Sequence, residues 1–248
     1  MRKTRRRSIA YGLPSFGQVS IRWTLAFSCL QRPMNSVCPY ICNLGFEVGI
    51  ARNNIVSTAL SLDPRPERIF FLDDDVIVHP YCLVQLLKAD KDIIGGVYYT
   101  KEEFAEPLMF GPAGTGTIPY HPGGGVKRIE TIGGGMSLVR LDVYEQMAKT
   151  LDLGTDVRGN PRWYYTSGDQ PGEQQINEDA WFCERAREAG YKVYADQHPY
   201  AFGWHHNRIT DQGYPIAQWN EYQKHGRAMW STSDLAEKCL IAEGLADG

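Results

Sequence analysis

A run of four apolar residues, 69–72, is followed directly by three carboxylates, Asp73, Asp74 and Asp75. A short, continuous apolar run is typical of a strand that is buried on both faces, as in a parallel sheet. Three adjacent carboxylates cannot lie inside such a sheet, because burying an unpaired charge is strongly unfavourable. We therefore expect the aspartates just beyond the carboxyl end of the strand, where open α/β sheets bind their ligands.

The close spacing of the three aspartates also predicts a bound cation. Like charges at this spacing repel one another, so a cation is needed to hold them together. A site with oxygen ligands favours Mg²⁺ or Mn²⁺ over Zn²⁺. The simpler alternative is a solvated acidic turn. The apolar run before the aspartates, and His79-Pro80 behind them as the start of a helix, favour the metal site.

Predicted strands and helices alternate up to residue 100. Apolar runs predict strands at 8–13, 40–44, 68–72 and 93–99. Helical periodicity predicts helices at 21–30, 48–62 and 80–89, the first of them buried. This order predicts an α/β fold with a mostly parallel central sheet flanked by helices.

The pattern is less regular beyond residue 100. Long loops are predicted at 111–125 and 152–175, and loops of this length are often functional in a compact domain. Further strands are expected at 129–132, 136–139 and 191–195, the last of them at an edge, and further helices at 141–147, 178–189, 215–229 and 233–243. We expect a disordered basic tail at 1–7, a single domain at 8–206 and a helical extension at 207–248.

Charge and cysteine content exclude several classes of protein. The net charge is −3, but five of the 26 basic residues lie in the first seven positions, which leaves 21 basic against 29 acidic residues, or −8, for the rest. An acidic body argues against a nucleic-acid partner, and no apolar run approaches the ~18 residues of a membrane-spanning helix. The six cysteines lack the spacing of a zinc site and favour a reducing, cytoplasmic location.

Two further polar clusters follow the aspartates along the chain. Glu178 and Asp179 come directly after Asn177, which is a good N-cap for the helix predicted there. His205 and His206 follow the strand predicted at 191–195. Each cluster has a simple structural explanation, because acidic residues in the first turn of a helix complement its dipole and a histidine pair can lie in an exposed turn. Their order in the chain nevertheless suggests that they belong to one site.

The order of these segments resembles that of the GT-A fold glycosyltransferases, which use nucleotide sugars. The similarity is to the broad inverting family that contains many polysaccharide and lipid-glycan synthases, and it covers residues 8–206. The segments that resemble this family are 51–53 (Ala-Arg-Asn), 71–75, 133–136 (Gly-Gly-Gly-Met), 178–190 and His205. The resemblance implies a Rossmann-like nucleotide-binding half at 8–100 and an acceptor-binding half at 101–206.

The same resemblance implies a divalent metal, Mn²⁺ or Mg²⁺, that bridges the diphosphate of the donor. It implies that Asp75 is the main metal ligand, that Asp73 faces the ribose or a metal-bound water, and that Asp74 supports them. His205 would complete the metal shell. His206 is the alternative, because a slip of one residue changes which ring points inward.

Further roles follow from the resemblance for residues that bind the nucleotide sugar. Pro14 and Ser15 would lie beside the nucleotide base, and Arg52 beside the nucleotide or its phosphates. Gly134 and Gly135 would allow the backbone to approach the donor sugar and the acceptor closely.

The resemblance also implies a general base at the start of the helix predicted at 178–189. Asp179 would take the proton of the acceptor hydroxyl, with Glu178 as the alternative. Such a base must lie within about 3 Å of the acceptor oxygen in the reactive complex. Trp163, Tyr164 and Trp181 are candidates for stacking on a sugar.

The sequence therefore predicts a metal-dependent glycosyltransferase that uses a UDP- or GDP-sugar and a glycan, lipid or protein acceptor. The membrane helices and the Gln-x-x-Arg-Trp motif of polymer-forming synthases are absent from the sequence, so we expect single additions, with inversion following from the base assignment. One alternative is a metal-dependent phosphohydrolase or nucleotidyltransferase, although Ile77 does not fit a nucleophilic Asp-x-Asp-x-Thr motif. The other alternative is a non-catalytic glycan-binding protein on a transferase fold.

Overall fold

A computed structural model of the chain describes residues 8–34, 36–101, 105–112, 114–165 and 177–205. The predicted basic tail at 1–7, the predicted extension at 207–248 and the candidate ligand His206 lie outside the described residues. The division at residue 100 into two functional halves stays a prediction.

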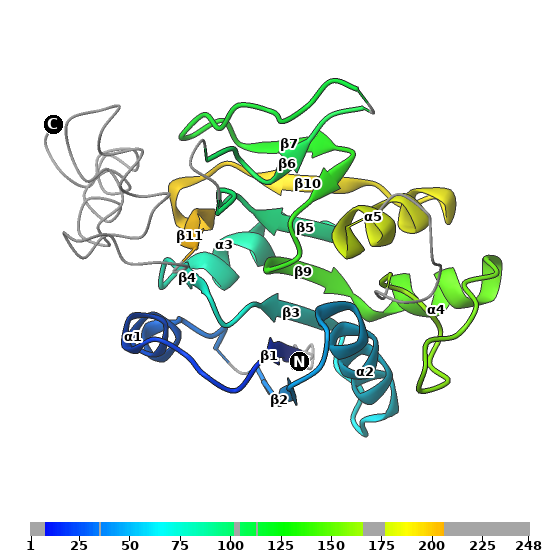
Figure 1. Ribbon diagram of the computed structural model, residues 1–248. Helices are drawn as coiled ribbons and strands as arrows, with labels where there is room; N and C mark the ends of the chain where they lie inside the picture. Colours follow the sequence, from blue (N-terminus) through cyan, green and yellow to red (C-terminus); the bar gives the residue numbers. More distant parts are fainter. Residues whose placement is uncertain (1–7, 35, 102–104, 113, 166–176, 206–248) are drawn as a thin grey trace, which may run out of the picture.

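A seven-stranded mixed sheet forms the centre of the fold (Figure 1). Its strands, in spatial order, are β2 (Tyr40–Leu44), β1 (Ile9–Ser15), β3 (Arg68–Leu72), β9 (Met136–Arg140), β5 (Ile93–Gly96), β10 (Val193–Asp196) and β7 (Val126–Ile129). Five strands run in one direction, whereas β9 and β7 run in the opposite direction. The predicted α/β class with a mostly parallel sheet is confirmed.

Helices flank this sheet. The helices form two groups that lie apart in Figure 1. In the first group, α4 contacts both of the other helices. The first group is α2 (Val48–Ser61), α4 (Leu141–Thr150) and α5 (Glu178–Glu188); the second is α1 (Ile21–Cys29) and α3 (Cys82–Lys88), with a short 3₁₀ turn, η1 (Pro199–Ala201), beside α3. Among the described residues, no helix is both long and apolar enough to cross a bilayer.

Two small sheets complete the described structure. One is an antiparallel pair formed by β6 (Met109–Phe110) and β8 (Thr131–Ile132), which lie before and after the loop predicted at 111–125. The pair formed by β4 (Val76–Val78) and β11 (Gly203–His205) is antiparallel, and its register sets His205 opposite Val76. This pairing brings the predicted histidine ligand next to the aspartates.

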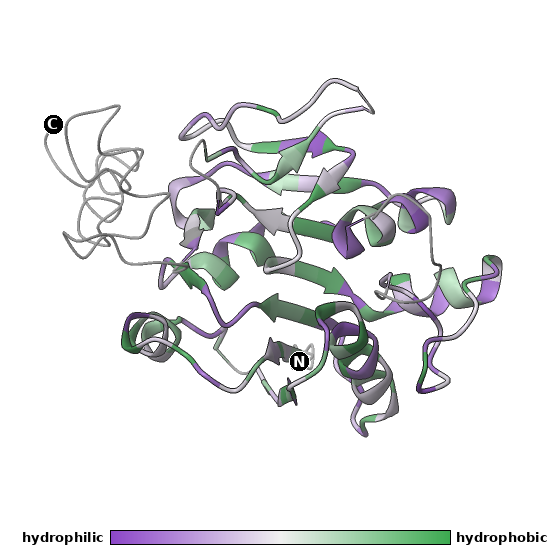
Figure 2. Cartoon of the chain, in the orientation of Figure 1, coloured by the Kyte–Doolittle hydropathy of each residue, from purple (hydrophilic) through white to green (hydrophobic). Residues whose placement is uncertain are grey.

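The apolar run before the aspartates is the buried strand that its sequence predicts. Residues 69–72 of β3 are at most 1% exposed, because β1 and β9 cover both edges and helices cover the faces. Figure 2 shows the apolar residues concentrated on the inner strands of the sheet. At the end of β3 the chain leaves the core, and the three aspartates begin there.

Most predicted elements are present, including the strand at 136–139, which is β9 and lies antiparallel between β3 and β5. Three expectations are wrong. The single strand predicted at 129–132 is two strands, β7 and β8, which belong to different sheets. The strand predicted at an edge is β10, which has β5 and β7 on its two sides. The helix at 21–30 is buried mainly at Trp23, while Ile21 and Leu25 are exposed. The short strands β4 and β11 were not expected, because three residues are too few to show a period.

Candidate active site

A cavity of about 260 Å³ lies at the carboxyl ends of β1 and β3. Its lining combines an apolar set, Pro14, Phe16, Phe46 and Val48, with a charged set, Asp73, Asp74, Asp75, Lys101 and Glu178. Ser15 also lines it. The carboxyl end of a buried strand is where the topology of an open α/β sheet leaves room for a ligand.

Asp73 is held against a buried guanidinium. Its two carboxylate oxygens accept hydrogen bonds from Nη2 of Arg52 at 3.1 and 3.0 Å. Its backbone is fixed as well, since its N–H donates to Gly135 and the indole N–H of Trp23 donates to its carbonyl oxygen. Burial raises the pKa of Asp73 to about 6, against the lowering effect of Arg52.

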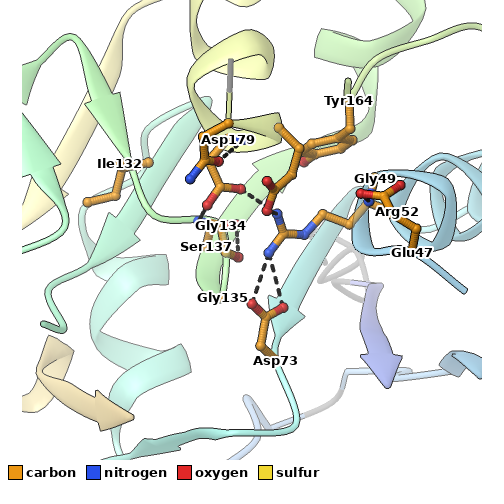
Figure 3. Close-up of polar contacts among 12 residues, drawn as sticks. Glu47, Gly49, Arg52, Asp73, Ile132, Gly134, Gly135, Ser137, Tyr164 and Asp179 are labelled. Atoms are coloured by element: carbon orange, nitrogen blue, oxygen red, sulfur yellow. Dashed lines mark hydrogen bonds and ion pairs between the residues drawn. The ribbon is translucent and has the colours of Figure 1, made fainter. Parts of the chain in front are cut away.

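The Arg52 side chain lies between this aspartate and the start of α5 (Figure 3). Only 1% of the side chain is exposed, and its Nη1 donates to Glu178 at 3.0 Å and to Asp179. Burial by itself would lower the pKa of Arg52, but the carboxylates of Asp179, Asp73 and Glu178 outweigh it and hold that pKa well above its usual value. One buried cation therefore joins three carboxylates from two distant segments, which we call the Arg52 cluster.

Asp179 is the most enclosed carboxylate of the Arg52 cluster. One oxygen accepts from Arg52, and the other accepts from the backbone N–H of Gly134 at 2.8 Å. Asn177 begins the helix as predicted, since its side chain accepts from the N–H of Asp179. Burial raises the pKa of Asp179 to about 6, although Arg52 lowers it.

The two predicted glycines leave space for the Arg52 cluster. A Cβ on Gly134 would lie 2.3 Å from a carboxylate oxygen of Asp179 and 2.7 Å from Arg52, and a Cβ on Gly135 would lie 2.6 Å from Asp73. Gly135 also donates its N–H to the hydroxyl of Tyr98 at 2.8 Å. In this structure the glycines therefore allow close approach of the backbone to carboxylates.

Asp74 joins the loop after β1 to the end of β3. It accepts a hydrogen bond from the hydroxyl of Ser15 at 2.6 Å and from the N–H of Phe16 at 3.1 Å. The Pro14-Ser15 segment that was predicted to contact a base is thereby held at the cavity lining.

Asp75 and His205 face each other across the β4–β11 pair. Nε2 of His205 lies 3.9 Å from Oδ1 of Asp75, and Nδ1 lies 2.7 Å from the carbonyl oxygen of Tyr99. A carbonyl only accepts, so Nδ1 carries the proton and the Nε2 lone pair faces the carboxylate. Burial lowers the pKa of His205 to about 4, against the raising effect of Asp75. A neutral imidazole and a carboxylate that face each other in this way are a donor pair suited to a divalent cation.

A lysine lies beside this donor pair. The ammonium group of Lys101 forms an ion pair with Asp75. Within the described part of the chain, no three His, Cys, Asp or Glu side chains are grouped as a metal site. Asp75 and His205 therefore fit a cation as two ligands, whereas the oxygens of Asp73 face Arg52.

The segment Ala51-Arg52-Asn53 has a structural role in α2. Asn53 is buried and exchanges two hydrogen bonds with the backbone of Tyr164, at 2.9 and 3.1 Å. The guanidinium of Arg52 lies over the ring of Tyr164, 5.5 Å from its centroid. Tyr164 and Trp163 are buried in the core, so neither presents a face for a sugar, contrary to one expectation.

Four residues of the cavity lining were not predicted as site residues: Phe16, Phe46, Val48 and Lys101. Phe46, Val48 and Lys101 have no neighbouring motif that would have distinguished them. Phe16 had one indirect signal, since it follows the Pro14-Ser15 turn at the end of a predicted strand.

Sequence comparisons find no matching family model and no similar curated protein. Similar solved structures include A197 from STIV (14% identity, 76% of this chain and 81% of that chain, TM-score 0.46). Another is GalNAc-T7 with UDP, GalNAc and Mn²⁺ (8% identity, 98% of this chain and 55% of that chain, TM-score 0.49). A third is the catalytic domain of Drosophila beta1,4galactosyltransferase 7 in complex with xylobiose (16% identity, 77% of this chain and 65% of that chain, TM-score 0.42). At these identities the likeness concerns the fold alone.

Proposed function

We propose that the chain is a metal-dependent glycosyltransferase that moves a sugar from a nucleoside-diphosphate sugar to an acceptor hydroxyl, by single additions and with inversion. The observation that supports this most is the cavity at the end of β3, whose lining includes Asp73, Asp74, Asp75 and Glu178. These residues come from the segments that resemble GT-A transferases in sequence.

The charge of the cavity supports a donor that binds together with a cation. Four carboxylates line it, and Lys101 is the cationic side chain of that lining. The excess of negative charge in this lining would repel a diphosphate unless a divalent cation bound as well. Asp75 and His205 would hold that cation, Mn²⁺ or Mg²⁺, which when bound neutralises the negative charge of the departing diphosphate.

The apolar part of the lining supports a nucleotide as the leaving group. Phe16, Phe46 and Pro14 offer flat or apolar surfaces to a base, beside the Asp74–Ser15 hydrogen bond. A cavity that combines a few polar groups with apolar walls is typical of small-ligand sites. UDP and GDP are the donor nucleotides that we propose.

The acidic pair at the start of α5 supports proton transfer from an acceptor hydroxyl of a glycan, lipid or protein. A general base of this kind increases the rate by about 10² to 10⁴-fold. Glu178 and Asp179 both belong to the Arg52 cluster, which fixes them relative to Asp73.

Thermal melting tests this function. We expect the melting temperature to rise when MnCl₂ and UDP or GDP are added together, and less with either alone. Asp75→Ala should abolish this joint shift, and Asp142→Ala, remote from the cavity in α4, serves as the control. A screen of UDP- and GDP-sugars, which measures the UDP or GDP released from each, then identifies the donor. Rapid hydrolysis of free nucleotides would instead indicate a phosphohydrolase, and the absence of any joint shift would contradict the proposal.

A further inference from the structure

We infer that Glu178, rather than Asp179, is the general base of this site, and that Asp179 is a positioning residue. The inference rests on the proposed function. It follows from the way in which the Arg52 cluster distributes hydrogen bonds between the two neighbouring carboxylates.

Both oxygens of Asp179 are already engaged. Oδ1 accepts from Arg52, and Oδ2 accepts from the N–H of Gly134 at 2.8 Å. Each oxygen keeps a second lone pair that could accept a proton, but a proton on either oxygen would weaken the hydrogen bond that Arg52 or the backbone N–H of Gly134 now donates to it. Asp179 also lies outside the cavity lining, with 12% of its side chain exposed.

Glu178 has the opposite arrangement. Its side chain lines the cavity together with Asp73, Asp74 and Asp75, and 20% of it is exposed. Oε1 accepts from Arg52 at 3.0 Å, and within the described residues no hydrogen bond to Oε2 is found. Arg52 thus holds one oxygen while the other is available to a hydroxyl in the cavity.

The chemical step balances with these groups. The acceptor hydroxyl gives its proton to Oε2 of Glu178, while its oxygen forms a bond to the anomeric carbon of the donor sugar. The bond between that carbon and the diphosphate breaks, and its electron pair leaves with the diphosphate. Asp179 holds the start of α5 against Gly134, which keeps Glu178 directed at the cavity.

Matched amide variants separate the two roles. Glu178→Gln and Asp179→Asn each remove one negative charge with little change in size. The assay measures the nucleoside diphosphate, UDP or GDP, that is released in the presence of MnCl₂ with water as the acceptor. The donors are UDP-glucose, UDP-galactose, UDP-GlcNAc, UDP-GalNAc and GDP-mannose. Thermal melting of each variant, with and without MnCl₂ and UDP, provides a readout that does not depend on activity.

For Glu178→Gln we expect at least a 100-fold loss of release, loss of the acidic limb of the pH profile, and an unchanged melting temperature and joint Mn²⁺–UDP shift. For Asp179→Asn we expect a melting temperature lower by several degrees and release reduced less than 10-fold, with the acidic limb retained. The lower stability follows because an amide nitrogen must face either Arg52 or the N–H of Gly134.

The reverse result would overturn the inference: near-normal release by Glu178→Gln, or a 100-fold loss in Asp179→Asn at unchanged melting temperature. Failure of the wild-type protein to release diphosphate from any of the five donors, or to show the joint shift, would overturn the proposed function and this inference with it. A wild type that is active and a Glu178→Gln variant that is equally active would reject the base assignment alone.

Discussion

The guanidinium of Arg52 donates to both carboxylate oxygens of Asp73, at 3.1 and 3.0 Å, and joins α2 to the end of β3. The same side chain reaches Glu178 and Asp179 at the start of α5. Three elements that are separate in the sequence therefore depend on one buried cation, and the acidic side of the cavity is built around it.

Removing this cation should destabilise the fold strongly. In Arg52→Met the carboxylates of Asp73, Glu178 and Asp179 lose their common partner, and breaking a buried ion pair costs about 3–5 kcal/mol. Urea denaturation monitored by circular dichroism measures the change in the free energy of unfolding.

The control for this variant is Arg65→Met. Arg65 pairs with Glu145 at the surface, where an ion pair contributes about 1 kcal/mol or less. Equal effects of the two substitutions would show that Arg52 does not hold the carboxylates together.

Adding a methyl group at Gly134 should disrupt the Arg52 cluster sterically. A Cβ there would lie 2.3 Å from Asp179 and 2.7 Å from Arg52, so the side chains must move apart. We expect Gly134→Ala to lower the free energy of unfolding by about 1–3 kcal/mol, the usual cost of overpacking. Thermal and urea denaturation measure it.

A matched comparison is Gly114→Ala, where φ is +83° but an added Cβ meets no atom within 4 Å. That variant measures backbone strain alone, about 1 kcal/mol. In addition, Gly134→Ala should lose diphosphate release, whereas Gly114→Ala should keep it. A normal rate of release in Gly134→Ala would contradict the geometry of the cluster.

Lys101 should compete with a divalent cation for Asp75. The two side chains form an ion pair, so a metal ion that binds Asp75 must displace the ammonium group. Lys101→Met is expected to bind Mn²⁺ about 5- to 10-fold more tightly than the wild type in the absence of nucleotide, which corresponds to roughly 1 kcal/mol for a partly exposed pair. Titration of Mn²⁺ followed by electron paramagnetic resonance measures this affinity.

The comparison variant for Lys101 is Lys149→Met, in the last turn of α4. Lys149 does not line the cavity, so its removal should leave the Mn²⁺ affinity unchanged. Weaker Mn²⁺ binding by Lys101→Met would mean that the lysine does not compete for Asp75.

Acid should destabilise the protein through His79. Burial, with a further contribution from His198, lowers the pKa of His79 from 6.5 to about 4, so the folded state favours the neutral ring. Nδ1 of this ring accepts the N–H of Tyr81 at 3.1 Å, which a protonated ring cannot do. The stabilisation is therefore complete above pH 6.5 and is lost as the pH falls towards 4, by at most about 1.4 kcal/mol per pH unit.

Urea denaturation between pH 4 and 7 tests this dependence. His79→Phe keeps a ring that can stack on Tyr200, as His79 does at 4.5 Å, but it has no group to protonate. We expect the variant to be less stable than the wild type at pH 7 and to lose less stability on acidification. Parallel curves for the two proteins would remove His79 as the cause.

The local pattern of apolar and capping residues was sufficient to predict most strands and helices of the fold. Residues 69–72 form the buried strand that their apolar run indicates, and Asp73 begins where that strand leaves the core. Asn177 caps α5, and Gly190 follows its end with φ +91°, a conformation that favours glycine. These features depend on neighbours in the chain, so a single sequence contains the information needed to predict them.

The contacts within the site depended on tertiary structure. Nothing near Arg52 in the sequence indicates that it joins Asp73 to Asp179, because that contact requires α2, β3 and α5 to meet at one end of the sheet. The approach of His205 to Asp75 likewise requires the β4–β11 pairing, whose two strands are too short to be predicted locally.

Local sequence patterns therefore indicate which carboxylates and which histidine lie at the ends of strands and helices. Only the folded chain decided how they share their partners: Asp179 between Arg52 and Gly134, Glu178 facing the cavity, and Asp75 between His205 and Lys101. Hydrogen bonds and ion pairs act over a few ångströms, whereas the residues that form them in this site are separated by 21 to 130 positions in the chain.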